Sequence, residues 1–206
     1  MIQQGSPEWF AQRVGKVTAS RVADVIAKTK TGYSTSRTNY MTELALERIT
    51  GQREDGFTNA AMQWGTETEP LARAAYESLT GALVEEVAMI DHPSIAMTGA
   101  SPDGLVDADG LVEIKCPTKS THMETLLGGN PAGKYITQMM WQMACTGRKW
   151  CDFVSFDPRF PLHLQLFVVR VPRDDLMVKS LEKEVVEFLK ELDVMVTQLN
   201  NLKKAA

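Results

Sequence analysis

Three residues near the middle of the chain have the types and the spacing that phosphodiester cleavage requires. Nine residues separate Asp103 from Glu113, and Lys115 follows Glu113 after a single residue. Mg²⁺ takes hard oxygen ligands at about 2.0–2.1 Å, usually one or two carboxylates together with waters and substrate phosphate. A neighbouring ammonium can orient or deprotonate the attacking water and offset the charge that develops on phosphorus. The pattern therefore favours a metal-dependent nuclease.

The local elements should bring these side chains together. Residues 107–110 read Asp-Ala-Asp-Gly, a strong turn sequence between two short apolar segments, so we expect a β-hairpin. Alternate side chains of a strand share a face, so Glu113 and Lys115 should point the same way and Ile114 into the opposite layer. The turn would bring Asp103 back beside Glu113. We expect the resulting site to lie at the edge of a sheet.

The same hairpin suggests how a metal would be held. The main-chain carbonyl of Ile114 would add a third oxygen to the carboxylates of Asp103 and Glu113. A second metal ion roughly 3.5–4 Å from the first would stabilise the leaving oxygen. The motif is short, however. Taken alone, it also fits a surface hairpin with a cross-strand Asp/Lys pair, which is common and contributes little to stability.

The rest of the chain predicts helices at both ends and strands between them. Pro70 predicts a kink or a helix boundary near Glu69, and the polar segment 28–37, which contains a glycine, predicts a loop. Apolar periodicity and turn residues predict a short helix through Trp9 and Phe10, helices opening at residue 18 and over 37–49, 58–79, 135–146 and 174–202, and strands over 84–90, 111–116, 152–156 and 163–171.

Length and composition describe one ordinary globular domain. The 206 residues are 44% hydrophobic and 23% charged, so residues 1–206 are expected to form a single α/β domain with a continuous core. The formal net charge is −4, whereas a general nucleic-acid coat is normally basic. A metal-dependent nuclease is less affected by this objection, because its site needs carboxylates whose charge bound cations partly offset.

Other classes of site and of location are not indicated. Cys116, Cys145 and Cys151 form no CxxC pair, and the histidines are scattered singly, so no zinc site is expected. Buried or half-buried thiols in a reducing cytosol are expected instead. No secretory signal is recognisable at the start, and no apolar stretch is long enough to span a bilayer. The protein is therefore expected not to associate with a membrane and to stay in the compartment where it is made.

Five segments in a fixed order resemble the lambda-exonuclease family, also called the YqaJ viral recombinase family. This family belongs with the PD-(D/E)xK nucleases, so the resemblance implies a restriction-endonuclease-like fold with a central mixed β-sheet flanked by helices. One motif would be weak, but five in order along most of the chain are specific. The segments are residues 13–20, 64–69, 101–104, 111–117 and 135–138.

The resemblance assigns roles around the metal. Asp103 and Glu113 match the metal ligands, and Lys115 matches the catalytic lysine. Glu69 matches an acidic residue near the metal or its water, although it would also fit a helical pair with Arg73.

A helix glutamine of the family completes the site. Gln138 matches it, although a capping or surface amide would also explain this residue. Family members often carry a second glutamine two positions later. Here that position is Met140, the next glutamine is Gln142, and its role is left open. Pro70 is a further departure from the family pattern in the helix that contains Glu69.

The segment from Arg13 to Ser20 resembles the family's anchor for the 5′-phosphate of a DNA end. Arginine binds phosphate with a bidentate fork, and hydroxyls at a helix N-terminus add donors where the dipole favours an anion. Thr18 or Ser20 could equally be a simple N-cap. Met62 could be an apolar wedge against the terminal base pair, but ordinary core packing is the preferred interpretation.

The resemblance implies a magnesium-dependent 5′-to-3′ exonuclease. Such an enzyme degrades one strand of linear duplex DNA to mononucleotides and leaves a 3′ single strand for recombination. It also implies two Mg²⁺ ions per site, replaceable by Mn²⁺, and a homotrimer ring around the DNA end. A single-strand annealing protein as partner and a phage or prophage origin, in the cytoplasm of a bacterial host, are implied as well.

Two alternatives stay open. One is another nuclease of the same fold, such as an endonuclease or a 3′-specific enzyme. The other is a catalytically silent subunit that binds DNA ends or acts as a scaffold. The intact Asp103, Glu113 and Lys115 argue against the silent subunit, and the segment from Arg13 to Ser20 argues against the other nucleases.

Overall fold

A five-stranded mixed sheet forms the centre of the molecule. The computed structural model describes residues 2–53 and 60–202. The strands lie in the order β10-β9-β8-β7-β4, so β8 (Gly110–Lys115) is the middle strand. It pairs parallel with β9 (Trp150–Phe156) and antiparallel with β7 (Gly104–Val106). The other two strands are β10 (Leu166–Pro172) and β4 (Val84–Glu85).

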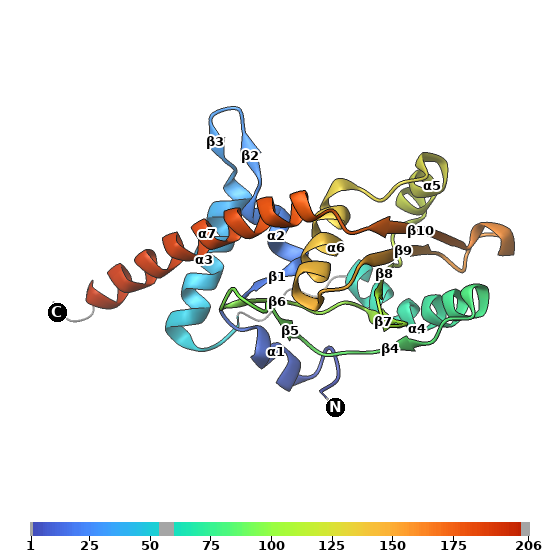
Figure 1. Ribbon diagram of the computed structural model, residues 1–206, viewed down its shortest axis with the longest axis horizontal. Coiled ribbons are helices and arrows are strands. Elements are labelled where there is room, and N and C mark those ends of the chain that lie inside the picture. The colour runs from blue at the N-terminus through green and yellow to red at the C-terminus, as the bar shows by residue number, and fades with distance from the viewer. Residues whose placement is uncertain (1, 54–59, 203–206) are drawn as a thin grey trace.

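Helices cover both faces of this sheet (Figure 1). On one face, Ala72 and Tyr76 of α4 (Ala60–Thr80) pack against Ile114 of β8 and Val154 of β9. On the other face, α6 (Gly133–Thr146) packs with Leu111 and Phe153 in the main core. The expected α/β class, with a restriction-endonuclease-like mixed sheet flanked by helices, is therefore confirmed.

The N-terminal segments and the last helix form a second layer beside α6. This part contains a three-stranded sheet in the order β1-β6-β5, and α3 (Thr35–Thr50) packs on α7 (Asp175–Leu202). The remaining elements of this part are α1 (Pro7–Arg13), β1 (Val17–Thr18), η1 (Ala19–Arg21), α2 (Val22–Val25), β5 (Ile90–Asp91) and β6 (Thr98–Ala100). The two ends of the chain lie on different sides of the molecule (Figure 1).

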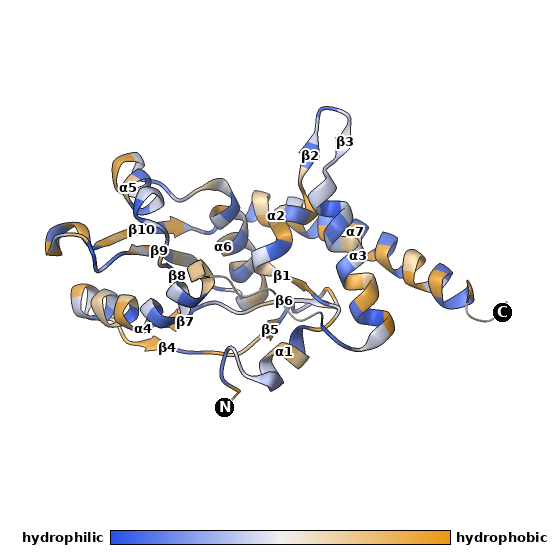
Figure 2. Cartoon of the chain, turned by 180° about the vertical axis from the view of Figure 1, so that it is seen from behind, coloured by the Kyte–Doolittle hydropathy of each residue, from blue (hydrophilic) through white to orange (hydrophobic). Residues whose placement is uncertain are grey.

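The predicted stripe of α7 is the part of the helix that enters the core. Leu181, Val185, Phe188 and Leu192 are buried, and Met195 is half-buried. Apolar and polar stretches alternate along the helix (Figure 2), as expected for a surface helix. Beyond Leu192 no described residue of α7 is buried, and the end of the helix projects from the body (Figure 1).

Two of the predicted elements, the strand over residues 84–90 and the loop over residues 28–37, were wrong. Residues 84–90 are not one strand, because β4 pairs with β7 in the large sheet whereas β5 pairs with β6 in the small one. Residues 28–37 are not simply a loop. They contain a hairpin of β2 (Lys28–Thr29) and β3 (Gly32–Tyr33) and the first turn of α3. Gly32, with φ of +142°, provides the backbone freedom that the tight turn needs.

Of the kink or boundary predicted near Glu69, the boundary is wrong, since α4 continues on both sides of Pro70. Proline removes the amide hydrogen that would bind the carbonyl of Thr66, at a cost to the helix. The packing of Ala72 and Tyr76, both fully buried, offsets this cost because it holds the second half of α4 on the sheet. The predicted helix start at residue 58 lies outside the described residues.

The other predicted elements were found with small shifts in their ends. Apolar periodicity did not predict α5 (Lys119–Gly128) or the short η2 turn (Leu162–Leu164). Thr118 caps α5 with its hydroxyl, which accepts from the backbone N–H of Thr121 at 3.4 Å. In the described part of the chain, no helix is both long and apolar enough to cross a bilayer.

Candidate active site

Asp103 lies immediately before β7 and reaches the middle strand. The register that pairs Gly104 with Val112 brings the start of β7 beside the end of β8. The Oδ2 atom of Asp103 accepts a hydrogen bond from the backbone N–H of Ile114 at 2.6 Å. The hairpin therefore brings Asp103 to the strand that holds Glu113, as predicted. The site lies at the end of the central strand of the sheet, not on an edge strand.

Glu113 points from β8 toward α6 and is completely buried. Its Oε1 atom accepts from Nε2 of Gln138 at 2.6 Å, and its Oε2 atom accepts from Nε2 of Gln142 at 2.5 Å. The two glutamines are four positions apart, so they lie on the same side of α6. A pair of amides thus holds the carboxylate in one orientation.

Lys115 shares the face of Glu113, as the alternation of the strand predicts. Its Nζ atom forms an ion pair with Oε1 of Glu113, and its side chain keeps 27% of its surface exposed. Burial lowers the pKa of Lys115, but the negative charges of Glu113 and Asp103 outweigh this and raise it overall. The ammonium is therefore positively charged at neutral pH, which suits it to offset negative charge and to orient a water molecule.

The surroundings of Asp103 disfavour its charged form, unlike those of Lys115. Burial and the nearby charge of Glu113 raise the pKa of Asp103 well above its ordinary value, whereas Lys115 lowers it. Two carboxylates held together in a buried place repel each other, and a cation between them would relieve this repulsion.

This donor set fits a magnesium ion. Among the described residues no group of three or more His, Cys, Asp or Glu side chains is arranged to hold a metal. Mg²⁺, however, commonly takes only one or two carboxylates and completes its shell with water and substrate oxygens. Asp103 and Ile114 line the cleft itself, and Glu113 lies directly behind Lys115.

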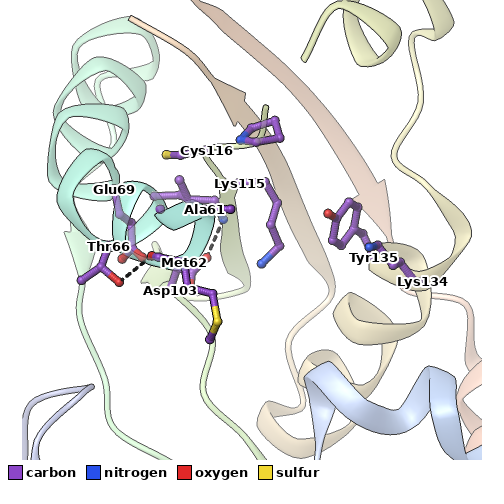
Figure 3. A pocket seen from close by; sticks show the side chains of 12 residues that line it. Ala61, Met62, Thr66, Glu69, Asp103, Lys115, Cys116, Lys134 and Tyr135 are labelled. Atoms are coloured by element: carbon purple, nitrogen blue, oxygen red, sulfur yellow. Dashed lines mark hydrogen bonds between the residues drawn. The ribbon is translucent and has the colours of Figure 1, made fainter. Parts of the chain in front are cut away.

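The active-site cleft has a volume of about 620 Å³ between the hairpin, α4 and the start of α6. Figure 3 shows Lys115 in the middle of it, with Glu69 and Asp103 on one side and Tyr135 on the other. Glu69 lines the cleft from α4, and its Oε1 atom accepts from Nη2 of Arg73 at 2.8 Å. Both interpretations of Glu69 thus agree with its position. Burial raises the pKa of this carboxyl above its ordinary value, and the positive charges of Arg73 and Lys115 offset only part of this rise.

The residues of the predicted phosphate anchor line a second, smaller pocket. This end pocket, of about 260 Å³, is lined by Arg13, Thr18, Ser20 and Met62 together. Ser20 is exposed, whereas Thr18 is buried and donates its backbone N–H to Oη of Tyr40 at 3.1 Å. Neither hydroxyl makes a helix-capping hydrogen bond at η1, and the two hydroxyl oxygens lie within hydrogen-bond distance of each other, at 3.4 Å.

Arg13 is held in place within the end pocket. Its guanidinium lies over the ring of Trp9, 4.2 Å from the centroid, and its Nη1 atom donates to Oγ of Ser101 at 3.2 Å. Burial lowers the pKa of Arg13 to about 10, so the side chain remains a cation at neutral pH. Lys16, Arg21 and Arg53 also line the pocket, together with Glu43 and Glu47.

Met62 lies where the two cavities meet. It lines both the active-site cleft and the end pocket, and 55% of its surface is exposed. The preferred interpretation of Met62 as a core residue was therefore wrong.

Sequence reasoning left Gln142 open and did not find Ser101, Tyr135 or Lys134. The four-residue spacing from Gln138 was a usable signal for Gln142, whereas Met140 faces elsewhere and is buried in the core. Ser101, by contrast, meets Arg13 across 88 positions of sequence, and no local pattern indicates such a contact. The three cysteines are free thiols, two buried and Cys116 half-buried, as expected.

Comparison with known proteins decides the family. Residues 8–149 match the YqaJ-like viral recombinase domain. The chain belongs to the YqaJ-like viral recombinase family. The family suggested by the five segments is thereby confirmed.

Solved structures agree with this assignment. An alkaline exonuclease from Laribacter hongkongensis, LHK-Exo, is 54% identical, with a TM-score of 0.92 over 98% of this chain and 100% of that chain. A second structure of LHK-Exo, in complex with dAMP, matches equally well. A phage-related exonuclease from Haemophilus somnus 129PT, 16% identical with a TM-score of 0.70 over 89% of this chain and 96% of that one, shares the fold. The search of curated proteins found no significant match.

Proposed function

We propose that this YqaJ family member is a magnesium-dependent 5′-to-3′ exonuclease. It would degrade one strand of linear duplex DNA to mononucleotides and leave a 3′ single strand. The observation that carries the proposal is the junction at Met62. There a cleft lined by Asp103 and Lys115 adjoins an end pocket lined by Arg13 and Ser20. An enzyme that removes nucleotides from an end needs both a cleavage site and a place for the terminal phosphate.

The similarity to LHK-Exo supports the same conclusion. That protein is described as an alkaline exonuclease, and it has been crystallised with dAMP, a deoxynucleoside monophosphate. A mononucleotide is the product class expected when cleavage takes place one nucleotide from an anchored end. Identity of 54% over nearly the whole chain makes transfer of the nuclease activity reasonable.

The residues of the cleft would divide the work as follows. Asp103, Glu113 and the carbonyl of Ile114 would hold Mg²⁺, which when bound polarises the phosphate and stabilises the developing charge. Gln138 and Gln142 keep the carboxylate of Glu113 oriented. Lys115 orients the attacking water and offsets charge at phosphorus. We expect two Mg²⁺ ions per site, with Mn²⁺ as a substitute.

The end pocket would set the register of cleavage. A phosphate held by Arg13, with help from Ser20 and Thr18, places the next phosphodiester bond over Lys115. Met62, exposed between the two cavities, would pack against the terminal base pair as an apolar wedge.

The same proposal includes the partners implied by the family resemblance. These are duplex DNA ends, a homotrimer ring that encircles DNA, and a single-strand annealing protein. The expected setting is a phage or prophage recombination system in the cytoplasm of a bacterial host.

The decisive experiment compares the two chemical forms of a DNA end. With Mg²⁺, a blunt duplex with 5′-phosphates should be degraded faster than the same duplex with 5′-hydroxyl ends. Arg13→Ala should slow the first substrate and shrink the difference, because a charged contact to phosphate is lost. Release of labelled mononucleotide from a 5′-labelled or a 3′-labelled strand measures rate and polarity together.

The controls separate the anchor from the metal site. Lys183→Ala, which removes an exposed cation of α7 that lines neither cavity, should keep the full preference. Asp103→Ala should remove cleavage of both substrates. A wild-type protein that ignores the 5′ group would show that the anchor is misassigned, and nicking of closed circles would favour an endonuclease.

A further inference from the structure

A third hollow adjoins the active-site cleft and has no role in the function described so far. This flanking groove has a volume of about 870 Å³ and lies between α4, α5 and α6. The first turns of two helices, α5 and α6, contribute to its wall, and the positive ends of helix dipoles favour anions. Its lining includes the hydroxyls of Thr118, Ser120 and Thr121 and the cations Lys119, Lys134 and Arg159.

The charge of the groove is opposite to that of the whole chain. Three cations, Lys119, Lys134 and Arg159, line it, and no acidic side chain does, although the chain carries a net charge of −4. Lys119 and Lys134 are exposed and have no ion-pair partner among the described residues. The charge of Arg159 is partly offset by Asp157, with which it pairs at 2.6 Å. The groove therefore favours an anion that extends along its surface.

The groove continues the path that runs from the end pocket through the cleft. Ala61, Cys116, Lys134 and Tyr135 line both the cleft and the flanking groove, whereas Met62 lines both the cleft and the end pocket. In Figure 3, Met62 lies toward one end of the cleft and Cys116 toward the other. The three cavities thus form one track with Lys115 in its middle section.

We propose that the flanking groove binds the phosphodiester backbone of the degraded strand on the 3′ side of the scissile bond. The inference rests on the proposed function, which assigns the 5′ end to the end pocket and the scissile phosphate to the cleft. A strand anchored at its 5′ end and cut above Lys115 must continue in the direction away from Met62. The groove lies in that direction and carries the matching charge.

Recognition in the groove concerns the backbone and not the bases. The guanidinium of Arg159 lies 4.2 Å from the ring centroid of Trp64, and the ammonium of Lys134 lies 4.9 Å from that of Tyr135. Cations therefore occupy positions over the aromatic rings on which bases would otherwise stack. Lysines and hydroxyls contact phosphate without reading sequence. The groove would hold any strand equally well, which suits an enzyme that removes successive nucleotides.

The test measures binding of single-stranded DNA as a function of salt. The protein carries Asp103→Ala so that it does not cleave, and the probe is a 5′-phosphorylated oligonucleotide followed by fluorescence anisotropy. Adding Lys119→Ala should weaken binding roughly three- to tenfold at low salt. It should also reduce the slope of log K against log salt by about 0.7, the value for one lost phosphate contact on a single strand. Lys179→Ala, an exposed cation of α7 that lines none of the three cavities, is the matched control and should change neither quantity.

Two further arms identify the strand. An oligonucleotide that ends one nucleotide beyond the scissile phosphate should not sense Lys119→Ala, because it is too short to enter the groove. An effect of Lys119→Ala seen only with duplexes that carry a 3′ overhang would assign the groove to the complementary strand and overturn the proposal. A slope equal to that of Lys179→Ala on every probe would overturn it as well.

The outcome is separable from that of the proposed function. If the protein with Asp103 intact degrades linear duplexes while Lys119→Ala leaves binding unchanged, only the role of the groove is lost. If it releases no nucleotide from any end, the proposed function fails first. Thermal unfolding of the Lys119→Ala variant, expected to match the parent protein, excludes a folding defect.

Discussion

At the scale of single residues, the site depends on how one buried carboxylate is satisfied. Glu113 has no exposed surface, and its charge is compensated by two amides of α6 and by the ammonium of Lys115 on its own strand. A buried charge is tolerated only when such partners are present, because the cost of removing it from water is large. The three partners therefore contribute to stability as well as to the orientation of the Glu113 carboxylate.

The first residue-scale prediction concerns Gln142. Gln142→Ala should lower the free energy of unfolding by about 1–3 kcal/mol, because Glu113 loses a donor in a place that water does not reach. It should also reduce turnover, since the carboxylate is no longer fixed. Gln138→Ala is the matched comparison and should cost less stability, because Gln138 is only half-buried. Urea unfolding measures both variants, and equal stability of Gln142→Ala and the parent protein would contradict the prediction.

The second residue-scale prediction concerns pH and Asp103. Because the folded protein raises the pKa of Asp103, the folded state binds this proton more tightly than the unfolded chain does. Its contribution to stability should therefore decrease as pH rises from about 3.9, the ordinary value, through the raised pKa. In EDTA, Asp103→Asn should remove this decrease and give a higher urea midpoint than the parent protein at neutral pH.

Magnesium supplies the complementary measurement for Asp103. Added Mg²⁺ should raise the melting temperature of the parent protein, because a ligand that binds only the folded state stabilises it. Asp103→Asn should show a much smaller rise. An unfolding midpoint of the metal-free parent that does not depend on pH in this range would refute the electrostatic account.

At the scale of elements, α4 connects the cavities and does so despite a proline. Its first turns carry Ala61 and Met62, its middle carries Glu69, and its second half is anchored on the sheet by Tyr76. Tyr76 donates to Oδ2 of Asp152 at 2.8 Å, and Asp152 also pairs with an arginine of β10. The packing of Tyr76 thus offsets the backbone hydrogen bond that is missing at Pro70.

The prediction at this scale is that Pro70→Ala stabilises the protein. Restoring an amide hydrogen opposite the carbonyl of Thr66 should add about 1–3 kcal/mol to the free energy of unfolding. Ser78→Ala, an exposed substitution in the same helix, is the control and should add only a few tenths of a kcal/mol. Chemical denaturation of the two variants is the measurement. A loss of stability in Pro70→Ala would show that the helix is adapted to the proline.

At the scale of the whole molecule, the arrangement of the cavities predicts a requirement for ends. The end pocket, the cleft and the flanking groove follow one another around the start of α4, because neighbouring cavities share lining residues there. A strand that fills the end pocket must terminate there if it is to lie across the cleft in a fixed register. The fold therefore suits a linear substrate.

The prediction at this scale compares linear and closed DNA. With Mg²⁺, a linear duplex should be degraded while the same sequence as a relaxed closed circle persists at least about a hundredfold longer, because the anchoring contact is absent. Gel analysis over time measures both, and a single cut in the circle should restore degradation. Light scattering on the protein without DNA should give a mass three times the 22.9 kDa of one chain. A monomer mass would remove the ring from the proposal without affecting the cleavage site.

Local patterns in the sequence were enough to predict the elements that position the candidate site. Glu113 and Lys115 share a face because strands alternate, and the turn at residues 107–110 returns the chain to Asp103. These are properties of neighbouring residues, so periodicity and turn chemistry predict them. The family resemblance extended the same reasoning to Gln138, and helical spacing alone would have added Gln142.

The surroundings of the site depend on contacts between segments that are far apart in the sequence. Arg13 meets Ser101, and Lys119, Lys134 and Arg159 surround one groove, although long stretches of chain separate them. The fate of Pro70 and the exposure of Met62 were decided in the same way, by the packing of α4 on the sheet. Such contacts depend on how distant elements pack, and their free energies outweigh the local preferences that a sequence pattern displays.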